Sequence, residues 1–243
     1  MTYVKIETTT CAFQNENDPN VAGPTREKQS TNLFTYRFWK DIYDRVFSLL
    51  ALVVLSPLMA LIALMIWFDS RGSAIHSRIQ VGEGGKEFTA YKFRTMYVDN
   101  DDQEYKSYLI RYIQEDAPYK VDRNGQALYK VVNDARVTKF GALLRKTNLD
   151  ELPQLFNVLR GEMSVIGPRP DIPFAVSMYK DWHRQRLSIR PGITGLWQVS
   201  GRKTLSFNDM VHLDIEYIKK QSPLLDIKIA LSTIGTIFRC DGS

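Results

Sequence analysis

The chain has 243 residues, of which 44% are hydrophobic, and this length is enough for one domain with a substantial core. Its 32 basic and 27 acidic residues give a formal net charge of +5, which suits an anionic membrane face or phosphorylated ligands. The sequence has no zinc-ligand spacing, no RNP-like run and no basic DNA-reading helix, so we expect no nucleic-acid partner.

Residues 1–35 have neither an apolar period nor the basic-then-apolar order of a signal peptide, and we predict a flexible tail there. The two cysteines, Cys11 and Cys240, stand near opposite ends and outside any Cys-x-x-Cys or Cys/His cluster. This spacing favours a reduced, cytosol-facing protein without a functional thiol.

Residues 36–70 contain a long apolar run, with 23 uncharged residues from Val46 to Phe68. As a straight helix this run would be roughly 35 Å long, enough to cross a bilayer core of about 30 Å. A buried core helix is the alternative, but the run lacks the polar face that such a helix usually has.

Ser56-Pro57 lies at the midpoint of the apolar run. Proline removes one backbone hydrogen bond and bends a helix, and each half would then be roughly 16 Å long, about half a bilayer. Basic and aromatic residues flank both ends of the run, as expected when both ends face the cytoplasm. A helix that enters and returns is therefore feasible, but kinked helices also span membranes, and the residues alone leave both topologies open.

Residues 74–96 predict a β-hairpin around a Gly-Glu-Gly-Gly turn. Strand alternation would place Lys92 and Arg94 on one face and Phe93 on the other. Those two cations could bind a substrate or simply form a solvated face. Residues 99–125 are polar and aromatic, and we expect a helix followed by a variable loop.

Residues 138–146 predict a short helix, and a second helix is expected to begin between Asn148 and Asp150. The inner side of this second helix would carry Leu152, Leu155, Phe156 and Leu159. Asn148 with Glu151 fits a capping box, and Asp150 fits an N-cap followed by Pro153 in the first turn.

The adjacent acids Asp150 and Glu151 also suit phosphate chemistry. They stand between the basic pair Arg145-Lys146 and the rigid turn Pro168-Arg169-Pro170. Carboxylate oxygens are ligands for a hard cation, and fixed arginines bind phosphoryl oxygens. A helix start and an anion site are compatible, because a helix N-terminus itself attracts anions.

Three later segments have a composition that suggests a role. Residues 190–199 form a turn-rich stretch that could build a nucleotide-binding wall around Trp197. His183 belongs to a basic-aromatic cluster, and we expect it at an interface rather than acting as a general base. Residues 223–239 are amphipathic and too polar to span, so they predict either a helix in the membrane interface or a packed helix of the fold.

The motifs from about Lys40 to Arg239, in this order, resemble those of the bacterial sugar transferases, also called monotopic phosphoglycosyl transferases. The stretches that carry the resemblance are Asp69-Ser70, Tyr91-Lys92-Phe93-Arg94-Thr95-Met96, Asn133-Asp134-x-Arg136, Leu149-Asp150-Glu151-Leu-Pro-Gln, Met163-Ser164-Val-Ile-Gly-Pro-Arg-Pro, Arg190-Pro-Gly-Ile-Thr-Gly-Leu-Trp-Gln-Val and Asp214-x-x-Tyr217.

The resemblance implies a membrane enzyme with a re-entrant helix kinked at Ser56-Pro57, a cytosolic catalytic domain over residues 71–240, and interfacial amphipathic helices. The expected fold is α/β, mostly helical with a small β-hairpin. The resemblance also implies a location at the bacterial inner membrane, with the catalytic domain facing the cytoplasm. Larger relatives carry an N-terminal multi-helix membrane domain, and we expect this chain to be the catalytic module alone.

The reaction that the resemblance implies is transfer of a sugar 1-phosphate from a UDP-sugar to undecaprenyl phosphate, with release of UMP. Asp150 matches the nucleophile, and Glu151 matches the acid associated with Mg²⁺. The remaining matches are substrate-binding positions: Arg145, Arg169 with Pro168 and Pro170, and, more loosely, Lys92, Arg94 and Asp214.

Departures from the family pattern lie at Ala135, Asn148 and Gln80, where proline, serine and arginine are usual. They are peripheral to the acid pair, so they affect the expected local geometry rather than the expected reaction.

Two other functions remain as alternatives, a membrane scaffold that binds phosphorylated lipids and a glycosyltransferase that moves only the sugar and releases UDP. The sequence has no Gly-x-x-x-x-Gly-Lys-Ser/Thr, which argues against a P-loop kinase. The sequence leaves open which sugar is used and whether the protein forms a homodimer.

Overall fold

The computed structural model describes residues 25–98, 103–121, 125, 127–129, 134, 136–201 and 204–238. Most of the predicted tail, together with Cys11, Asn133 and Cys240, lies outside these residues. The helices are α1 (Thr25–Asp69), α2 (Gln103–Gln114), α3 (Lys139–Thr147), α4 (Leu155–Arg160), α5 (Pro173–Ser177), α6 (Leu196–Ser200), α7 (Phe207–Lys220) and α8 (Pro223–Phe238).

The described strands form three two-stranded sheets. Two are antiparallel, β1 (Ile75–Val81) with β2 (Glu87–Phe93) and β3 (Lys120–Val121) with β4 (Ala127–Leu128), and one is parallel, β5 (Ser164–Ile166) with β6 (Gly192–Thr194). Short 3₁₀ helices complete the fold: η1 (Glu83–Gly85), η2 (Leu149–Gln154) and η3 (His183–Ser188). The mostly helical fold with small sheets is confirmed.

The predicted hairpin is the β1–β2 pair, in which Ile75 faces Phe93 and Val81 faces Glu87. Its turn contains Gly84 at φ 67° and Gly85 at φ 78°, backbone angles that favour glycine. The hairpin prediction is confirmed, and β2 ends at Phe93, one residue before Arg94.

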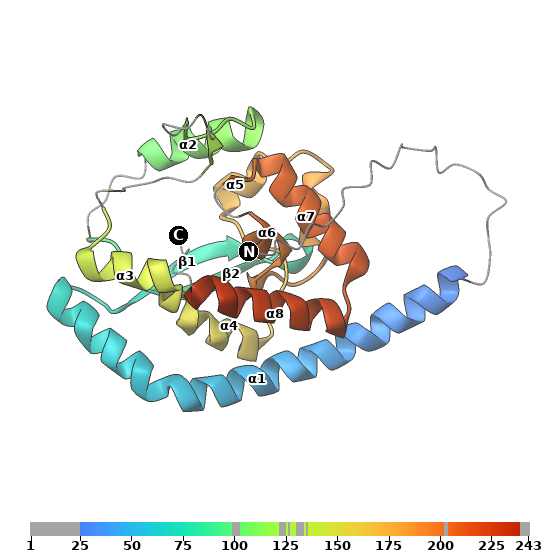
Figure 1. Cartoon of the computed structure of the whole chain (residues 1–243), viewed down its shortest axis with the longest axis horizontal. Coiled ribbons are helices and arrows are strands. Elements are labelled where there is room, and N and C mark those ends of the chain that lie inside the picture. The colour runs from blue at the N-terminus through green and yellow to red at the C-terminus, as the bar shows by residue number, and fades with distance from the viewer. Residues whose placement is uncertain are drawn as a thin grey trace.

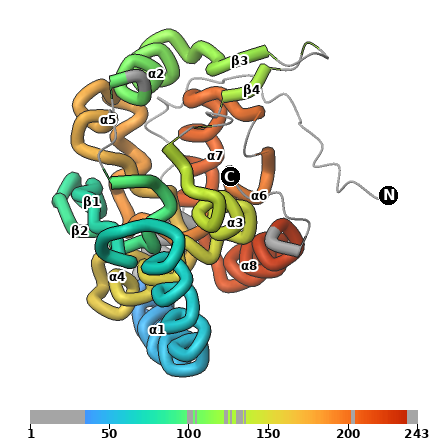
Figure 2. Tube along the Cα trace, turned by 90° about the vertical axis from the view of Figure 1, so that its left-hand side faces the viewer, coloured from blue at the N-terminus to red at the C-terminus, as the bar shows by residue number. Residues whose placement is uncertain are grey.

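Helix α1 runs along one side of the molecule and bends on the way (Figure 1), while α2 and the β3–β4 sheet lie at the opposite end (Figure 2). Helix α1 has 45 residues with Pro57 among them, and it begins within the segment predicted as a tail. Because Pro57 has no N–H, the carbonyl of Val53 loses its helical partner. The Ser56 hydroxyl donates a 2.8 Å hydrogen bond to that carbonyl. The side chain beside the kink therefore replaces the backbone partner that the Val53 carbonyl lacks.

The outward side of α1 is apolar and exposed. Val53, Val54 and Phe68 expose 66%, 73% and 73% of their surface, whereas Ile62 and Ile66 are buried against Phe93 and Leu144. Residues 35–69 are long and apolar enough to cross a membrane, and only 11% of their most apolar window is buried. A solvent-facing stripe of this kind needs a lipid or protein partner.

Two close backbone approaches fix the segments around the acid pair. A Cβ on Gly141 would lie 2.2 Å from the carbonyl oxygen of Thr95, so α3 packs directly on the chain that follows β2. A Cβ on Gly192 would lie 2.1 Å from the Gly167 nitrogen, so β6 packs equally tightly on the segment that follows β5. Neither position has room for a methyl group.

Several local predictions need correction. Asn148 adopts the left-handed conformation that ends α3, its side chain makes no capping bond, and the predicted capping box is wrong. Asp150 lies inside η2 rather than at an N-cap, and α4 begins only at Leu155. Phe156 is 48% exposed instead of facing inward.

His183 is also placed differently from the prediction. Its ring is fully buried, where it accepts a hydrogen bond from the Lys180 backbone N–H and contacts Asn208. It is therefore a core residue and not an interfacial one.

Helix α8 has two different faces. Ile229 is buried in a core cluster with Ile166, Ile189 and Tyr217. The opposite face exposes Leu224, Ile227, Leu231 and Ile234. The helix therefore packs on the fold and also presents an apolar stripe.

Candidate active site

The acid pair Asp150-Glu151 is the centre of the site. Both residues lie in η2, and each is only 8% exposed. The Glu151 carboxylate pairs with Lys92 Nζ at 3.0 Å and with the Arg169 guanidinium at 2.6 and 3.2 Å. Residues from β2, η2 and the loop after β5 thus meet at one carboxylate.

The two acids differ in their surroundings. Glu151 accepts from both cations, whereas no hydrogen bond or ion pair from a described residue engages the carboxylate of Asp150. Burial raises the pKa of Asp150, the neighbouring Glu151 charge raises it further, and Lys92, Arg169 and Arg145 only partly offset this. Burial would also raise the pKa of Glu151, but Arg169 and Lys92 outweigh it and hold that pKa well below the usual range. Among the described residues, the site therefore contains one carboxylate without a hydrogen-bonding partner beside one that cations hold ionised.

Arg145 approaches the pair from α3. Its Nε donates a 2.9 Å hydrogen bond to Thr95 Oγ1, and its charge lowers the pKa of Asp150. The close contact of Gly141 with Thr95 fixes this cation relative to β2. Lys92, Arg145 and Arg169 thus surround Asp150 with positive charge.

The loop that carries Arg169 is fastened through its backbone. The Gly167 N–H donates to Thr194 at 2.9 Å, and the Pro168 carbonyl accepts from Gly192 at 2.8 Å. The Arg169 carbonyl accepts from the Arg186 guanidinium at 3.0 Å. With Pro168 and Pro170 on either side, Arg169 is presented by a rigid turn.

Asp214 lies behind this loop and not against the acid pair. It is 1% exposed and pairs with Arg186 at 2.6 Å, and burial raises its pKa to about 7. Since Arg186 also binds Asp171 and the Arg169 carbonyl, Asp214 supports the loop from within the core.

Arg94 is separated from Lys92. Its guanidinium donates to the Ser70 carbonyl at 2.5 Å and contacts the Ser70 hydroxyl at 3.0 Å, where the chain leaves α1. No described contact brings Arg94 to Asp150 or Glu151. Trp197 packs against a hydrophobic cluster around Phe207.

Three residues beside the site were not predicted to act in it. The ring of Tyr105 lies 5.7 Å from the Arg78 guanidinium and 5.9 Å from that of Arg136. Burial raises the pKa of Tyr105, and the charge of Arg169 acts against this. Arg136 belonged to a recognised motif, but nothing in the sequence marked Tyr105 as lying between two arginines.

Among the described residues, no cluster of three or more His, Cys, Asp or Glu side chains could hold a metal on its own. Mg²⁺ commonly takes one or two protein carboxylates and completes its shell with phosphate oxygens and water. The unpaired Asp150 carboxylate and the lightly engaged Oε2 of Glu151 fit such a shared ion better than a free-standing one.

Known proteins are similar to this chain over most of its length. Residues 35–240 match the family described as bacterial sugar transferase. The exopolysaccharide production protein ExoY of Sinorhizobium fredii is 38% identical over 204 residues, which cover 84% of this chain and 87% of that protein. The undecaprenyl-phosphate galactose phosphotransferase of Salmonella typhimurium is 40% identical over 207 residues, covering 85% of this chain.

A third relative, the UDP-glucose:undecaprenyl-phosphate glucose-1-phosphate transferase of Xanthomonas campestris, is 34% identical over 203 residues and 80% of this chain. The chain spans only 42% of the length of the Salmonella protein and 37% of that of the Xanthomonas protein.

Proposed function

The chain belongs to the bacterial sugar transferase family, and on this premise we propose that it transfers a sugar 1-phosphate from a UDP-sugar to undecaprenyl phosphate, releasing UMP. The observation that carries the proposal is the buried Asp150, whose carboxylate no described residue hydrogen-bonds, beside a Glu151 that two cations hold. The printed names of the Salmonella and Xanthomonas relatives specify sugar-phosphate transfer to this lipid.

The proposed first step is attack by a carboxylate oxygen of Asp150 on the β-phosphorus of the UDP-sugar. The bond from that phosphorus to the bridging oxygen breaks, UMP leaves, and a phosphosugar remains on Asp150. A phosphate oxygen of the lipid then attacks the same phosphorus and releases the carboxylate. No general base is required, because an aspartate is ionised at neutral pH.

The surrounding cations make this attack feasible. An anionic nucleophile and a diphosphate repel one another, and Lys92, Arg145 and Arg169 offset that repulsion. The raised pKa of Asp150 makes its carboxylate a stronger nucleophile than an ordinary aspartate. Asp150 and Glu151 would hold Mg²⁺ together with the diphosphate, and the ion would neutralise charge that develops on the departing UMP.

Release of UMP distinguishes this reaction from its alternatives. We expect the purified protein with undecaprenyl phosphate and Mg²⁺ to form UMP from at least one member of a panel of UDP-sugars. Formation of UDP instead would identify a transferase that moves only the sugar. A failure to form either nucleotide, with retained binding of phosphorylated lipid, would favour the scaffold alternative.

We further propose that α1 enters and leaves the membrane on the same side, which places the catalytic domain at the cytoplasmic face of the inner membrane. The first half of α1 pairs with the catalytic domain through Lys40 and Asp226, and its end does so through Ser70 and Arg94. A helix that crossed the bilayer would carry these two ends to opposite faces, out of reach of one domain. The exposed stripe of α8 would then lie in the interface, with its apolar side toward lipid.

This topology predicts the accessibility of Cys11 in a Cys240→Ser background. In intact spheroplasts, Cys11 is expected to resist a membrane-impermeant maleimide and to react after lysis. Pro57→Leu restores the missing backbone donor and straightens the helix, so a fraction of the molecules is expected to become reactive in intact spheroplasts.

The matched control is Lys219→Cys in a Cys11→Ser, Cys240→Ser background, because Lys219 is exposed on the catalytic domain. It should react only after lysis in both helix variants. Strong labelling of Cys11 before lysis in the protein with Pro57 would contradict the re-entrant topology.

A further inference from the structure

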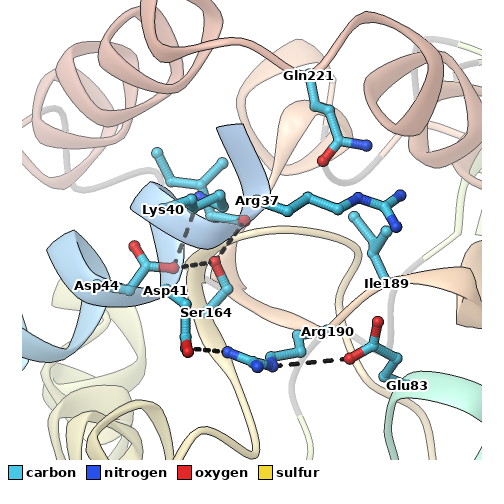
Figure 3. Close-up of a pocket in the computed structure, with 10 residues that line it drawn as sticks. Arg37, Lys40, Asp41, Asp44, Glu83, Ser164, Ile189, Arg190 and Gln221 are labelled. Carbon is cyan, nitrogen blue, oxygen red and sulfur yellow. Dashed lines mark hydrogen bonds and ion pairs between the residues drawn. The ribbon is translucent and has the colours of Figure 1, made fainter. Parts of the chain in front are cut away.

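The first half of α1 carries a polar face toward the catalytic domain. Tyr36, Lys40 and Asp44 are spaced four residues apart, so they share one side of the helix, with Asp41 next to them. In Figure 3, Lys40, Asp41 and Asp44 lie beside Ser164 and Arg190, around a pocket at the junction of α1 with β5 and β6. The acid pair does not line this pocket.

Asp226 at the start of α8 is the main partner of this face. Its Oδ2 accepts from the Lys40 ammonium at 2.6 Å and from the Tyr36 hydroxyl at 2.7 Å. Its Oδ1 accepts from the Tyr217 hydroxyl of α7 at 2.8 Å. The side chains of Lys40 and Asp226 are only 13% and 16% exposed, so water screens this ion pair weakly.

A second set of contacts joins the same face to the parallel sheet. The Ser164 hydroxyl at the start of β5 donates to Asp44 at 2.5 Å, and Arg190, just before β6, forms an ion pair with Asp41. We call the two sets together the α1 latch: Tyr36, Lys40, Asp41, Asp44, Ser164, Arg190, Tyr217 and Asp226.

The α1 latch contains none of the bonds that hold Arg169 and Glu151, although Ser164 lies on β5 and Arg190 just before β6, the two strands that also fasten the Arg169 loop. The loop that carries Arg169 is held through Gly167, Pro168 and Arg186, and none of these bonds involves α1. Glu151 is held by Lys92 and Arg169, and neither lies on α1. Loosening the Lys40–Asp226 contact, which involves α8 and neither strand, should therefore leave the acid pair in place while freeing the first half of α1.

We propose that the α1 latch is a positioning device that fixes the membrane-embedded α1 relative to Asp150, and that only the lipid-dependent step requires it. This inference rests on the proposed function, in which one half-reaction uses a substrate dissolved in water and the other uses a substrate held in the membrane. The UDP-sugar arrives from water and meets a preformed site. The lipid phosphate arrives from the bilayer, so its distance from Asp150 depends on how α1 is oriented.

The half-reactions separate this role from a general structural one. Without lipid acceptor, Lys40→Met is expected to keep the UMP burst within about 2-fold of wild type, because the loop and the acid pair are unaffected. With acceptor, its steady-state transfer should fall about 10- to 100-fold, since small misplacements of a reactant cost that much. Lys40→Arg keeps a positive charge beside Asp226 and Asp44 and should retain most of the transfer.

Lys220→Met is the matched control, because Lys220 forms an ion pair with Glu216 at the surface, with side-chain exposures of 69% and 45%. It should change neither half-reaction. An equal loss of both half-reactions in Lys40→Met, or no loss in either, would overturn the proposal. Absence of UMP formation in the wild type would instead count against the proposed function.

A distance measurement tests the latch without any activity. Spin labels at Val53→Cys and Lys219→Cys, in a Cys11→Ser, Cys240→Ser background in lipid nanodiscs, report the placement of α1 against α7. Val53 is 66% exposed, which suits a label. The distance distribution should be narrow with Lys40 present and should broaden or shift in Lys40→Met. An unchanged distribution would overturn the proposal whatever the kinetics show.

Discussion

Asp150→Asn is expected to abolish the burst of UMP that the proposed reaction predicts from a UDP-sugar in the absence of lipid acceptor. An amide is nearly isosteric with a carboxylate but is not a nucleophile, so the burst rate should fall by about 10⁴-fold or more. Rapid quenching with nucleotide chromatography measures the burst, and intact-protein mass spectrometry measures the covalent phosphosugar. Because the Asp150 side chain makes no hydrogen bond to a described residue and the amide occupies the same space, the variant should fold normally.

Glu216→Gln is the control for Asp150→Asn, since it also neutralises an acid but lies on the exposed surface of α7. The pH dependence gives a second measurement. Because burial raises the pKa of Asp150, the burst of the wild type should be lost on acidification at a pH above the ordinary aspartate value of about 3.9. An Asp150→Asn variant that still forms the covalent intermediate would remove Asp150 as the nucleophile.

Glu151→Gln is expected to weaken both stability and activity. It removes the carboxylate that Lys92 and Arg169 share and leaves two largely buried cations without that partner. Breaking a buried ion pair from one side costs about 3–5 kcal/mol, and partial exposure of the two cations should bring the loss toward about 2–4 kcal/mol. Chemical denaturation measures this loss, and the UMP burst should fall by about 10²- to 10³-fold.

The stability difference between wild type and Glu151→Gln should depend on pH. The pKa of Glu151 is depressed in the folded protein, so its contribution is fully present above the unfolded value of about 4.3 and is lost as the pH falls toward the folded value. The two proteins should therefore converge in stability as the medium becomes strongly acidic. Glu216→Gln at an exposed ion pair should change stability by less than about 1 kcal/mol. A Glu151→Gln variant as stable as the wild type would show that the ion pairs of Glu151 with Lys92 and Arg169 do not contribute to the free energy of unfolding.

Lys92, Glu151 and Arg169 were assigned to one site by the family resemblance, and the structure brings their side chains together. The hairpin was predictable from its own residues, since its turn has glycines where the backbone requires them. Alternation of strand faces failed at Arg94, because β2 ends at Phe93 and the next residue turns toward Ser70. The alternation of side chains between the two faces of a strand does not extend to residues beyond the end of that strand.

The prediction for the second helix failed because two kinds of helix share the segment. The residues of η2 follow a period of about three, whereas an α-helix has 3.6, and this phase difference rotates Phe156 outward. Asn148 fits a capping box in sequence but is needed in a left-handed conformation to end α3. The capping signal at Asn148 and the need to end α3 there conflicted, and the left-handed turn between the two helices prevailed.

The α1 latch was missed for a different reason. Charges such as Lys40 beside an apolar run are typical flanks of a membrane segment, and this pattern does not reveal a partner 186 residues away. Tyr105 was missed likewise, because only the folded chain brings Arg78 and Arg136 to its ring. Long-range pairing of isolated charges and rings has no signature in a single sequence.

The backbone contacts at Gly141 and Gly192 have a consequence for how enzymes of this kind diversify. A region with no room for a methyl group cannot be modified in small steps, since even alanine would displace the segments that carry Arg145 and Arg169. We therefore expect this phosphate-handling region to be inherited almost unaltered. Under the proposed function, preference for one sugar over another would then have to evolve through side chains around this region, such as Tyr105 of α2, whose ring lies between Arg78 and Arg136.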